Sequence, residues 1–388
     1  MKILYYEMRK SWLRIPTFIV LAVFLALNIF RLNDYCRDYY STYGGFKEPY
    51  FGLYNTVCGE LTNENLELFK MRAKELENEI VTQTYSKNYD IEKYEFTGYA
   101  HGDFSLYSLI ITPEISYCAT YSNTSNQISE KAAESYHLFN KIGNTFEAQK
   151  NKLIYKQYAN RNIPEYRATN WANAYFSYDF SSLLCVVLLI FGLAAGFTKE
   201  RESGMSQLIT AYGKSKCTVF AKVGSALLFC LLLSVAFTVS DFVSVQAFLG
   251  VDGVDMPIYS AKLFELSPYK FSFAEGILLC SALRLLGLFA ISLVISFISK
   301  ISPNTVAATA ASFGMFVVLI LLSLITNSVF DAVNLLTPKT YLLKFNVVNL
   351  LGFPVLELYA AVVAVSLLCA VLILLIAAGR AKNASSRD

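Results

Sequence analysis

This sequence of 388 residues contains few of the residues and motifs that usually carry enzyme chemistry. Its only histidines, His101 and His137, stand apart and belong to no metal-ligand motif. None of the eight cysteines is part of a CxxC pair, and HExxH and GxSxG motifs are absent. No pair of aspartates lies within the apolar runs, as an intramembrane protease would need. We therefore expect no catalytic residue, no metal site and no cofactor in this chain.

A complete phosphate-binding loop is also absent. Gly213, Lys214 and Ser215 match the end of the pattern GxxxxGK[ST], but Leu208 occupies the place of its first glycine. No parallel-sheet pattern surrounds these residues, and the neighbouring segments are too short to fold into a nucleotidase. If the protein uses ATP, a separate polypeptide must bind and hydrolyse it, so we predict that this chain is not an enzyme.

Hydrophobic residues make up 55% of the sequence and are concentrated in six runs. A helix needs about 17–25 apolar residues to cross the hydrocarbon core of a bilayer, and each run reaches or approaches that length. The first run reaches it only when Trp12 and Leu13 are included. We predict an all-α polytopic membrane protein whose six transmembrane helices place both termini on one side. The runs are Ile15–Phe30, Phe180–Phe197, Val219–Phe248, Ala274–Ile298, Val306–Ile325 and Val355–Ala378.

Lysine and arginine predict which side of the membrane is cytoplasmic, because short cytoplasmic loops carry an excess of them. The short loops on the opposite side carry only Lys262, Lys270, Lys339 and Lys344. We expect both termini to be cytoplasmic, in the plasma membrane of a bacterium, with membrane lipids around the spans. The bases on the predicted cytoplasmic side are Lys2, Arg9, Lys10, Arg14, Lys199, Arg201, Lys214, Lys216, Lys222, Lys300, Arg380, Lys382 and Arg387.

The N-terminal segment begins like a signal peptide, with basic residues before an apolar run. The run continues through Asn28–Arg31 without a small-x-small cleavage site, so we predict a retained first span. Apolar residues before it recur at helical spacing, which predicts an amphipathic helix along the inner leaflet; a simple basic flank is the alternative. The first unit comprises residues 1–31, and its apolar stripe consists of Ile3, Leu4, Met8, Trp12 and Ile15.

Residues 32–176 form the only large segment without a long apolar run, and six spans place this segment outside the cell. We predict a large, mainly helical extracellular domain there, because two apolar stripes show helical spacing. Between the stripes, residues 89–126 contain short apolar clusters broken by Gly98, Gly102 and Pro113, which are compatible with short strands or irregular structure. The stripes consist of Leu66, Phe69, Ala73, Leu76 and Ile80, and of Ile128, Ala132, Ser135, Phe139, Ile142, Phe146 and Leu153.

The charged segment between the second and third runs is the clearest functional signal in the sequence. Residues 199–216 combine a Glu-Arg-Glu cluster with a short apolar ridge formed by Met205, Leu208 and Ile209. Gly204 can break the helix that leaves the membrane. The ridge offers an apolar contact to a partner, and mixed charges at its rim can fix the register of that contact. The alternative is a basic loop that only sets the topology.

This segment resembles the coupling region of ABC-2-type exporter permeases, in which a Glu-Arg-Glu cluster is followed by Gly-Thr, leucines and a Pro-x-Ser-Arg ending. The amphipathic N-terminus and the six-span layout agree with that family, whereas the large external domain is unusual for its simplest members. Three positions depart from the pattern, since Met205 replaces threonine, Gly213 replaces proline and Lys216 replaces arginine. The matching residues are Glu200, Arg201, Glu202, Gly204, Leu208, Ile209 and Ser215.

The resemblance implies that the chain is the membrane-spanning permease subunit of an ATP-driven ABC exporter. In that family the loop contains a coupling helix, which docks in a groove of the ATPase. Two permease subunits, identical or homologous, then assemble with two ABC ATPase subunits that bind the ATP, and we expect no nucleic-acid partner. Peptides, lipids and amphipathic drugs are all compatible substrates. Residues 177–388 form this unit, with transmembrane helices two to six and the coupling loop 199–216.

Two charged residues stand out within the apolar runs. Arg284 lies deep in the fourth run, where a charge costs about 2.5–3.5 kcal/mol on insertion scales. Asp241 lies at similar depth in the antiparallel third run, so we predict an intramembrane pair between them. Snorkelling of Arg284, or its exposure to a polar translocation path, is the alternative. Residues 327–354 either re-enter the membrane as helices, as the resemblance implies, or form a surface loop.

Two other functions stay open. A mechanotransmitting or sensing ABC permease would use ATPase cycling to move its external domain without transporting anything. A large domain directly after the first span favours this hypothesis, although four spans are more usual for it. A polytopic membrane enzyme is the third hypothesis, and the missing catalytic motifs disfavour it.

Overall fold

The protein is mostly helical, as its computed structural model shows. Four bases that entered the orientation argument, Lys214, Arg380, Lys382 and Arg387, lie outside the described residues. The structure describes residues 2–42, 47–60, 63–83, 96–97, 100–213, 215–326 and 333–378.

Six helical segments within the described ranges are long and apolar enough to cross a membrane, which confirms the six predicted spans. They are Ile15–Arg37, Asn170–Glu202, Lys216–Leu249, Phe273–Ile301, Thr305–Ser323 and Glu357–Ala378. The predicted N-terminal helix is also present and precedes the first span as a separate element. The main helices are α1 (Lys2–Ser11), α2 (Ile15–Thr42), α8 (Asn170–Ser177), α9 (Phe180–Leu193), α12 (Ser215–Leu249), α13 (Phe273–Ile301), α14 (Thr305–Thr326) and α16 (Glu357–Ala378).

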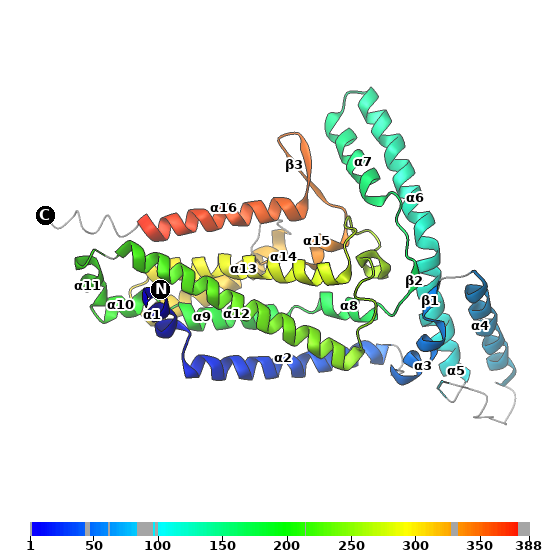
Figure 1. Cartoon of the computed structure of the whole chain (residues 1–388), viewed down its shortest axis with the longest axis horizontal. Helices are drawn as coiled ribbons and strands as arrows, with labels where there is room; N and C mark the ends of the chain where they lie inside the picture. The colour runs from blue at the N-terminus through cyan, green and yellow to red at the C-terminus, as the bar shows by residue number, and fades with distance from the viewer. Residues whose placement is uncertain are drawn as a thin grey trace.

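The molecule is elongated, and its two ends are built from different parts of the chain (Figure 1). One end holds α1, the short helices α10 (Thr198–Glu202) and α11 (Met205–Ala211), and the last turn of α16. The opposite end holds the helices between the first and second spans. An alternating path of six spans requires this separation. The helices of the opposite end are α3 (Lys47–Val57), α4 (Asn63–Gln83), α5 (Ala100–Phe104), α6 (Thr112–Lys141) and α7 (Thr145–Tyr158).

The two predicted helical stripes have different outcomes. The first stripe lies on α4, as expected. The second is not one helix, because the chain turns back after Lys141 and its residues divide between α6 and α7. Gly143 adopts a left-handed φ of +76°, and the Asn144 side chain accepts a hydrogen bond from the backbone N–H of Glu147. These two features end one helix and begin the next, so the stripe forms a helical hairpin.

Residues 100–126 are helical, which corrects the expectation of short strands or irregular structure; residues 89–95 and Gly98 lie outside the described ranges. A π-helical segment, Ser105–Ile111, connects α5 to α6, and the Thr112 N–H bonds the Tyr107 carbonyl five residues back. Pro113 follows in the first turn of α6. Proline removes a backbone donor and clashes with the carbonyl four residues earlier, so the wider π-helical turn lets the helix pass through it.

A buried arginine holds the α6–α7 hairpin on the segment that joins α12 to α13. Arg161 is only 1% exposed, and its guanidinium donates to the carbonyl oxygen of Ser267 at 2.9 Å and to the hydroxyl of Tyr121 at 2.9 Å. The rings of Tyr158 and Tyr259 lie 4.3 and 4.8 Å from it. The hairpin is therefore fixed to the segment between the third and fourth spans.

After the fifth span, the described residues 333–356 form a short helix and a β-hairpin in place of the re-entrant helices that the resemblance implied. The helix is α15 (Lys339–Leu343), and the antiparallel strands are β3 (Val347–Leu350) and β4 (Phe353–Leu356). A second pair, β1 (Gly59–Glu60) and β2 (Glu165–Tyr166), joins the start of the segment between the first and second spans to its end. Leu351 at the hairpin tip is 98% exposed.

Candidate functional site

The second span is interrupted just before the charged segment. Residues 194–197 separate α9 from α10, and a broken helix leaves backbone groups without their usual partners. The Phe197 N–H donates to Ser299 Oγ at 3.1 Å, and the Gly196 carbonyl accepts from Lys222 Nζ at 2.5 Å. Side chains from α13 and α12 therefore provide hydrogen-bond partners for the backbone groups at the break and hold α10 against the bundle.

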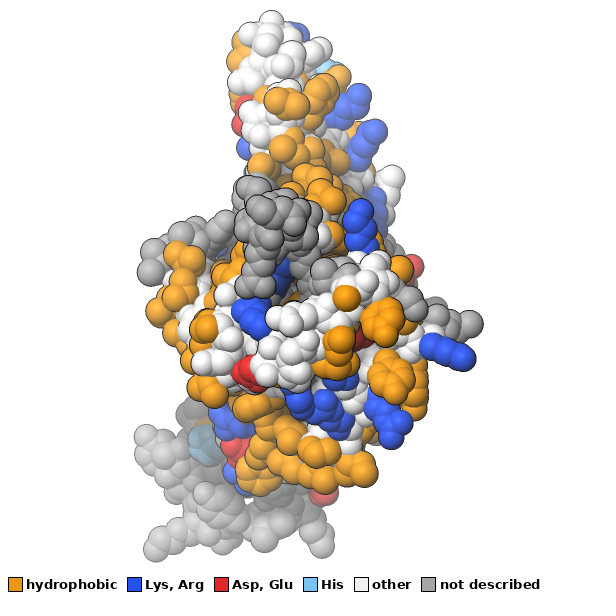
Figure 2. Space-filling model, turned by 90° about the vertical axis from the view of Figure 1, so that its left-hand side faces the viewer, with side chains coloured by type: hydrophobic (Ala, Val, Ile, Leu, Met, Phe, Trp, Pro, Cys, Tyr) orange, Lys and Arg blue, Asp and Glu red, His pale blue; other side chains and the backbone are white. Residues whose placement is uncertain are grey.

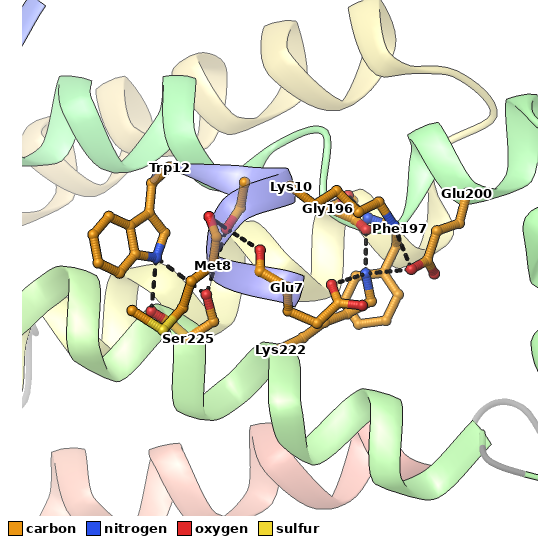
Figure 3. Close-up of polar contacts among 11 residues, drawn as sticks. Glu7, Met8, Lys10, Trp12, Gly196, Phe197, Glu200, Lys222 and Ser225 are labelled. Atoms are coloured by element: carbon orange, nitrogen blue, oxygen red, sulfur yellow. Dashed lines mark hydrogen bonds and ion pairs between the residues drawn. The ribbon is translucent and has the colours of Figure 1, made fainter. Parts of the chain in front are cut away.

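Lys222 is the centre of a buried ionic cluster formed by Glu7, Lys10, Glu200 and Lys222 (Figure 3). Its ammonium lies 2.9 Å from Glu200 Oε1 and 3.0 Å from Glu7 Oε2. Lys10 Nζ reaches the same Glu200 oxygen at 2.5 Å. The side chains of Glu200 and Lys222 are 1% and 8% exposed, so both charges depend on these partners. The ionic cluster joins α1, α10 and α12.

The N-terminal helix is anchored to α12 by Trp12 as well. The indole Nε1 donates to the backbone oxygen and hydroxyl of Ser225, both at 3.1 Å (Figure 3). Its ring stacks on Phe229 at 5.0 Å. Phe229 in turn contacts α9, since a Cβ at Gly192 would lie 2.6 Å from its ring. Therefore α1 packs on the bundle against α12, which in turn contacts α9.

The other two charges of the Glu-Arg-Glu cluster bind the connection between α13 and α14. Arg201 donates to the carbonyl oxygens of Ser302, at 2.5 Å, and Lys300. Glu202 accepts from the backbone N–H of Thr305 at 2.7 Å, at the first residue of α14. A carboxylate at this position satisfies a free helix N–H and favours the positive end of the helix dipole.

The three charges of the cluster lie in different environments. We predicted that Glu200, Arg201 and Glu202 form a charged rim that faces a partner. Glu200 is buried, whereas Arg201 and Glu202 are exposed and also bond to the neighbouring loop between α13 and α14. Glu7, Lys10 and Lys222 were not predicted as site residues. Lys10 and Lys222 were counted only as topology signals, and Glu7 belongs to no motif. The position of Lys222 inside an apolar run could have indicated that its charge has a buried partner.

The apolar ridge lies on α11, outside the bundle. Gly204 has a left-handed φ of +72° and separates α10 from α11, as its place in the sequence predicted. Met205 is 49% exposed and Leu208 is 55% exposed, whereas Ile209 is half-buried. Tyr212, which the sequence argument did not include, is 78% exposed just after α11. A short helix thus presents large apolar side chains to the surroundings at this end of the molecule.

Basic side chains surround this end (Figure 2). The exposed bases among the described residues here are Lys2, Arg9, Lys199, Arg201 and Lys216, whereas Glu202 is the exposed acid. An apolar helix with a positive surround matches a partner groove that is apolar inside and acidic at its rim.

Asp241 and Arg284 lie together in a second polar site between α12 and α13. Arg284 Nη1 is 3.3 Å from Asp241 Oδ2, and both side chains are largely buried. Asn28, on α2, donates to the other carboxylate oxygen at 2.7 Å. Tyr178 donates to Asn28 Oδ1 at 3.1 Å. The pair is therefore part of a network across three spans; the sequence argument missed Asn28, which stands out only as an amide within an apolar run.

The two polar sites contain no metal-ligand cluster, since no group of three or more His, Cys, Asp or Glu side chains with suitable geometry occurs among the described residues.

Comparison with known proteins gives one match. The model of a family described as ABC-2 family transporter protein matches residues 64–379, which is most of the chain. Comparisons with curated proteins and with solved structures returned no match.

Proposed function

Because this chain belongs to the ABC-2 family of transporter proteins, in which it is a permease membrane component, we propose that it exports an amphipathic substrate, a peptide, lipid or drug, using ATP hydrolysed by a separate subunit. The observation that carries the mechanism is α11, a helix that exposes an apolar ridge within a positive surround. We propose that α11 is the coupling helix and that an ABC ATPase binds it.

The proposed orientation places α11, α1 and both termini in the cytoplasm, and α3–α7 outside the cell. The basic residues around α11 support it, because cytoplasmic loops carry the excess of lysine and arginine. The functional unit is a pair of permease subunits, identical or homologous, with one ATPase on each α11. ATP is bound by those ATPase subunits.

The ionic cluster supports a path for the coupling movement. A displacement of α11 acts on α10 through Gly204, and Glu200 connects α10 to both α1 and α12. Arg201 and Glu202 connect the same helix to the start of α14. A single push on α11 would therefore act on the third and fifth spans together, which is what a change of access across the membrane requires.

Replacement of Met205 and Leu208 by aspartate tests the docking proposal. Both side chains are exposed in the isolated chain, so the variant should fold and insert normally. Placing carboxylates in an apolar contact costs several kcal/mol, so the ATPase should no longer co-purify. The control is Gln207→Asp on the same helix, which adds one charge at an exposed polar position and should keep the partner. If M205D/L208D retains the ATPase and its stimulated activity, the partner docks elsewhere.

Mechanotransmission is the second candidate, and the anchoring of the α6–α7 hairpin favours it. Arg161 and three tyrosines fix the hairpin to the segment between α12 and α13, so a shift of these spans moves the hairpin with them. Distances measured between spin labels on the α7 helices of the two permease subunits during ATP turnover, together with a transport assay, would separate the two functions. Movement of the hairpin without transfer of any retained substrate across vesicles would favour mechanotransmission.

A further inference from the structure

A cavity of about 250 Å³ lies where α6 meets α8 and the segment that contains the short helices η3 (Ile258–Ser260) and η4 (Lys262–Phe264). It is far from α11 along the molecule, and none of the roles proposed above uses it. Its walls combine acidic, basic, amide and hydroxyl groups with an apolar side formed by Leu109, Ile110 and Pro113.

Two oxygen atoms on residues that line the cavity lack hydrogen-bond partners in the described structure. Ser260 is 3% exposed, and its Oγ is buried without a partner. Asn173 Oδ1 is in the same condition on the α8 wall. Buried polar atoms nearly always find a partner in folded proteins, so these two residues make the cavity a candidate site for a bound molecule or water.

The charged groups of the cavity lie on different elements. Glu114, on α6, accepts hydrogen bonds on Oε2 from the hydroxyls of Tyr166 at 2.5 Å and Tyr50 at 3.3 Å. Lys262, on the η3–η4 segment, is exposed at the cavity surface. A ligand that carries both charges would match both groups, whereas a ligand with a single charge would match only one of them.

We propose that this cavity binds a small zwitterion of the α-amino-acid class. Its ammonium group interacts with Glu114 and Asn173. Its carboxylate accepts from the Ser260 hydroxyl and pairs with Lys262. Its apolar side chain packs against the wall of Leu109 and Ile110. The size supports this class, because sites for drug-sized ligands usually exceed about 300 Å³. The inference does not depend on the membrane orientation or on ATPase docking.

The pKa of Glu114 makes the binding dependent on pH. Burial raises this pKa above its usual value, although hydrogen bonds from Tyr166, Asn170 and Tyr50 oppose the shift. Cys118 and Lys262 also line the cavity near this carboxyl group. An ammonium ligand requires the ionised carboxylate, so affinity should fall as the pH decreases through the raised pKa.

Calorimetric titration of the purified full chain in nanodiscs tests the proposal, with leucine as the probe. Isoamylamine and 4-methylpentanoate serve as its two halves, since one lacks the carboxylate and the other the ammonium group. Leucine should bind more tightly than either half. Glu114→Gln should weaken leucine and isoamylamine by about tenfold, the effect expected for one lost charge-assisted hydrogen bond, and should leave 4-methylpentanoate no weaker.

The matched control is Glu130→Gln, which changes an exposed glutamate on the same helix and should leave all three affinities unchanged. Ser260→Ala removes one hydroxyl from the opposite wall and should weaken leucine and 4-methylpentanoate, but not isoamylamine. Thermal unfolding of each variant checks that it is folded. If leucine does not bind to the wild type, or if E114Q and S260A bind it as the wild type does, water molecules complete the two oxygens and the proposal is wrong.

Discussion

Two buried basic side chains, at opposite ends of the molecule, are stabilised in different ways. Lys222 lies between the carboxylates of Glu7 and Glu200, which belong to α1 and α10. Arg161, beneath the α6–α7 hairpin, is held by carbonyl oxygens, a tyrosine hydroxyl and two tyrosine rings. Attraction between full charges falls slowly with distance, whereas hydrogen bonds to neutral oxygens require a narrow geometry. At the end that carries α11, the ion pairs around Lys222 tolerate displacement, although Lys222 and Arg201 also donate to the carbonyl oxygens of Gly196 and Ser302. At the other end, the contacts of Arg161 hold one arrangement.

Loss of Arg161 should have the largest effect. Arg161→Ala leaves the buried carbonyl oxygens of Gln157, Ser267 and Tyr269 without this donor, so we expect a loss of about 3–5 kcal/mol and release of the hairpin. Arg161→Lys keeps the charge but not the planar set of donors, and should recover only part of the stability. Thermal unfolding and trypsin cleavage within α6–α7 measure both effects.

The control for this prediction is Lys156→Ala, which removes an exposed base from the same hairpin. It should change the stability by less than about 0.5 kcal/mol. Equal protease resistance in R161A and K156A would show that the hairpin does not depend on the buried arginine.

Removal of the Glu200 charge should have a smaller effect, because Glu7 remains beside Lys222. We expect Glu200→Gln to cost about 1–3 kcal/mol and to uncouple ATP hydrolysis from transport before it unfolds the protein. The double variant with Lys222→Met should lose less stability than the sum of the two single variants. When Lys222 is absent, removal of the Glu200 charge no longer takes a partner from a buried lysine. Unfolding of the four proteins in a double-mutant cycle measures this.

Glu202→Gln is the matched comparison on the same helix. It keeps the hydrogen-bond acceptor at the start of α14 and changes only an exposed charge, so we expect a smaller loss than for E200Q. If E200Q and E202Q lose the same stability, the burial of Glu200 has no energetic consequence. The ionic cluster then does not connect α10 to α1 and α12 energetically.

The Asp241–Arg284 pair should give a coupling of about 0.6–1.7 kcal/mol, from the average to the largest value that double-mutant cycles give for polar pairs between membrane helices. Either alanine variant should lose stability or activity, and the charge-swapped double variant should recover part of it. Asn28 reduces the effect, because it still donates to Asp241 when Arg284 is removed. Absence of coupling would show that Arg284 acts on a polar path instead of on Asp241.

The smallest effect concerns the pH dependence of stability that Glu114 contributes, at the end of the molecule that contains α6. Burial raises the folded-state pKa of Glu114, so this group stabilises the fold at low pH and loses that contribution as the pH rises from about 4.3, the usual value, through its raised pKa. Glu114→Gln should flatten the stability profile over that window, as thermal unfolding at several pH values would reveal. If the stability of the wild type rises across this pH window while that of E114Q stays flat, the folded-state pKa of Glu114 is lowered and the prediction is wrong.

The sequence predicted correctly the features that depend on the local composition and spacing of residues. The apolar runs predicted the six spans, since length and hydropathy decide whether a segment can cross a bilayer. The Gly204 break and the first helical stripe were also readable from local spacing. The second stripe failed because its rhythm continues across a turn: Phe139 and Phe146 keep helical spacing although they lie on separate helices.

The sequence by itself determined a six-span helical membrane protein, the position of its charged segment and the family to which that segment points. Only the tertiary structure decided that Glu200 faces inward while Met205 and Leu208 face outward, and that Lys222 belongs to an ionic cluster with α1. The physical reason is that hydropathy is a property of each segment, whereas the partner of a buried charge is set by which distant elements pack around it. Residues 7, 10, 200 and 222 meet only because α1 and α10 fold back onto α12.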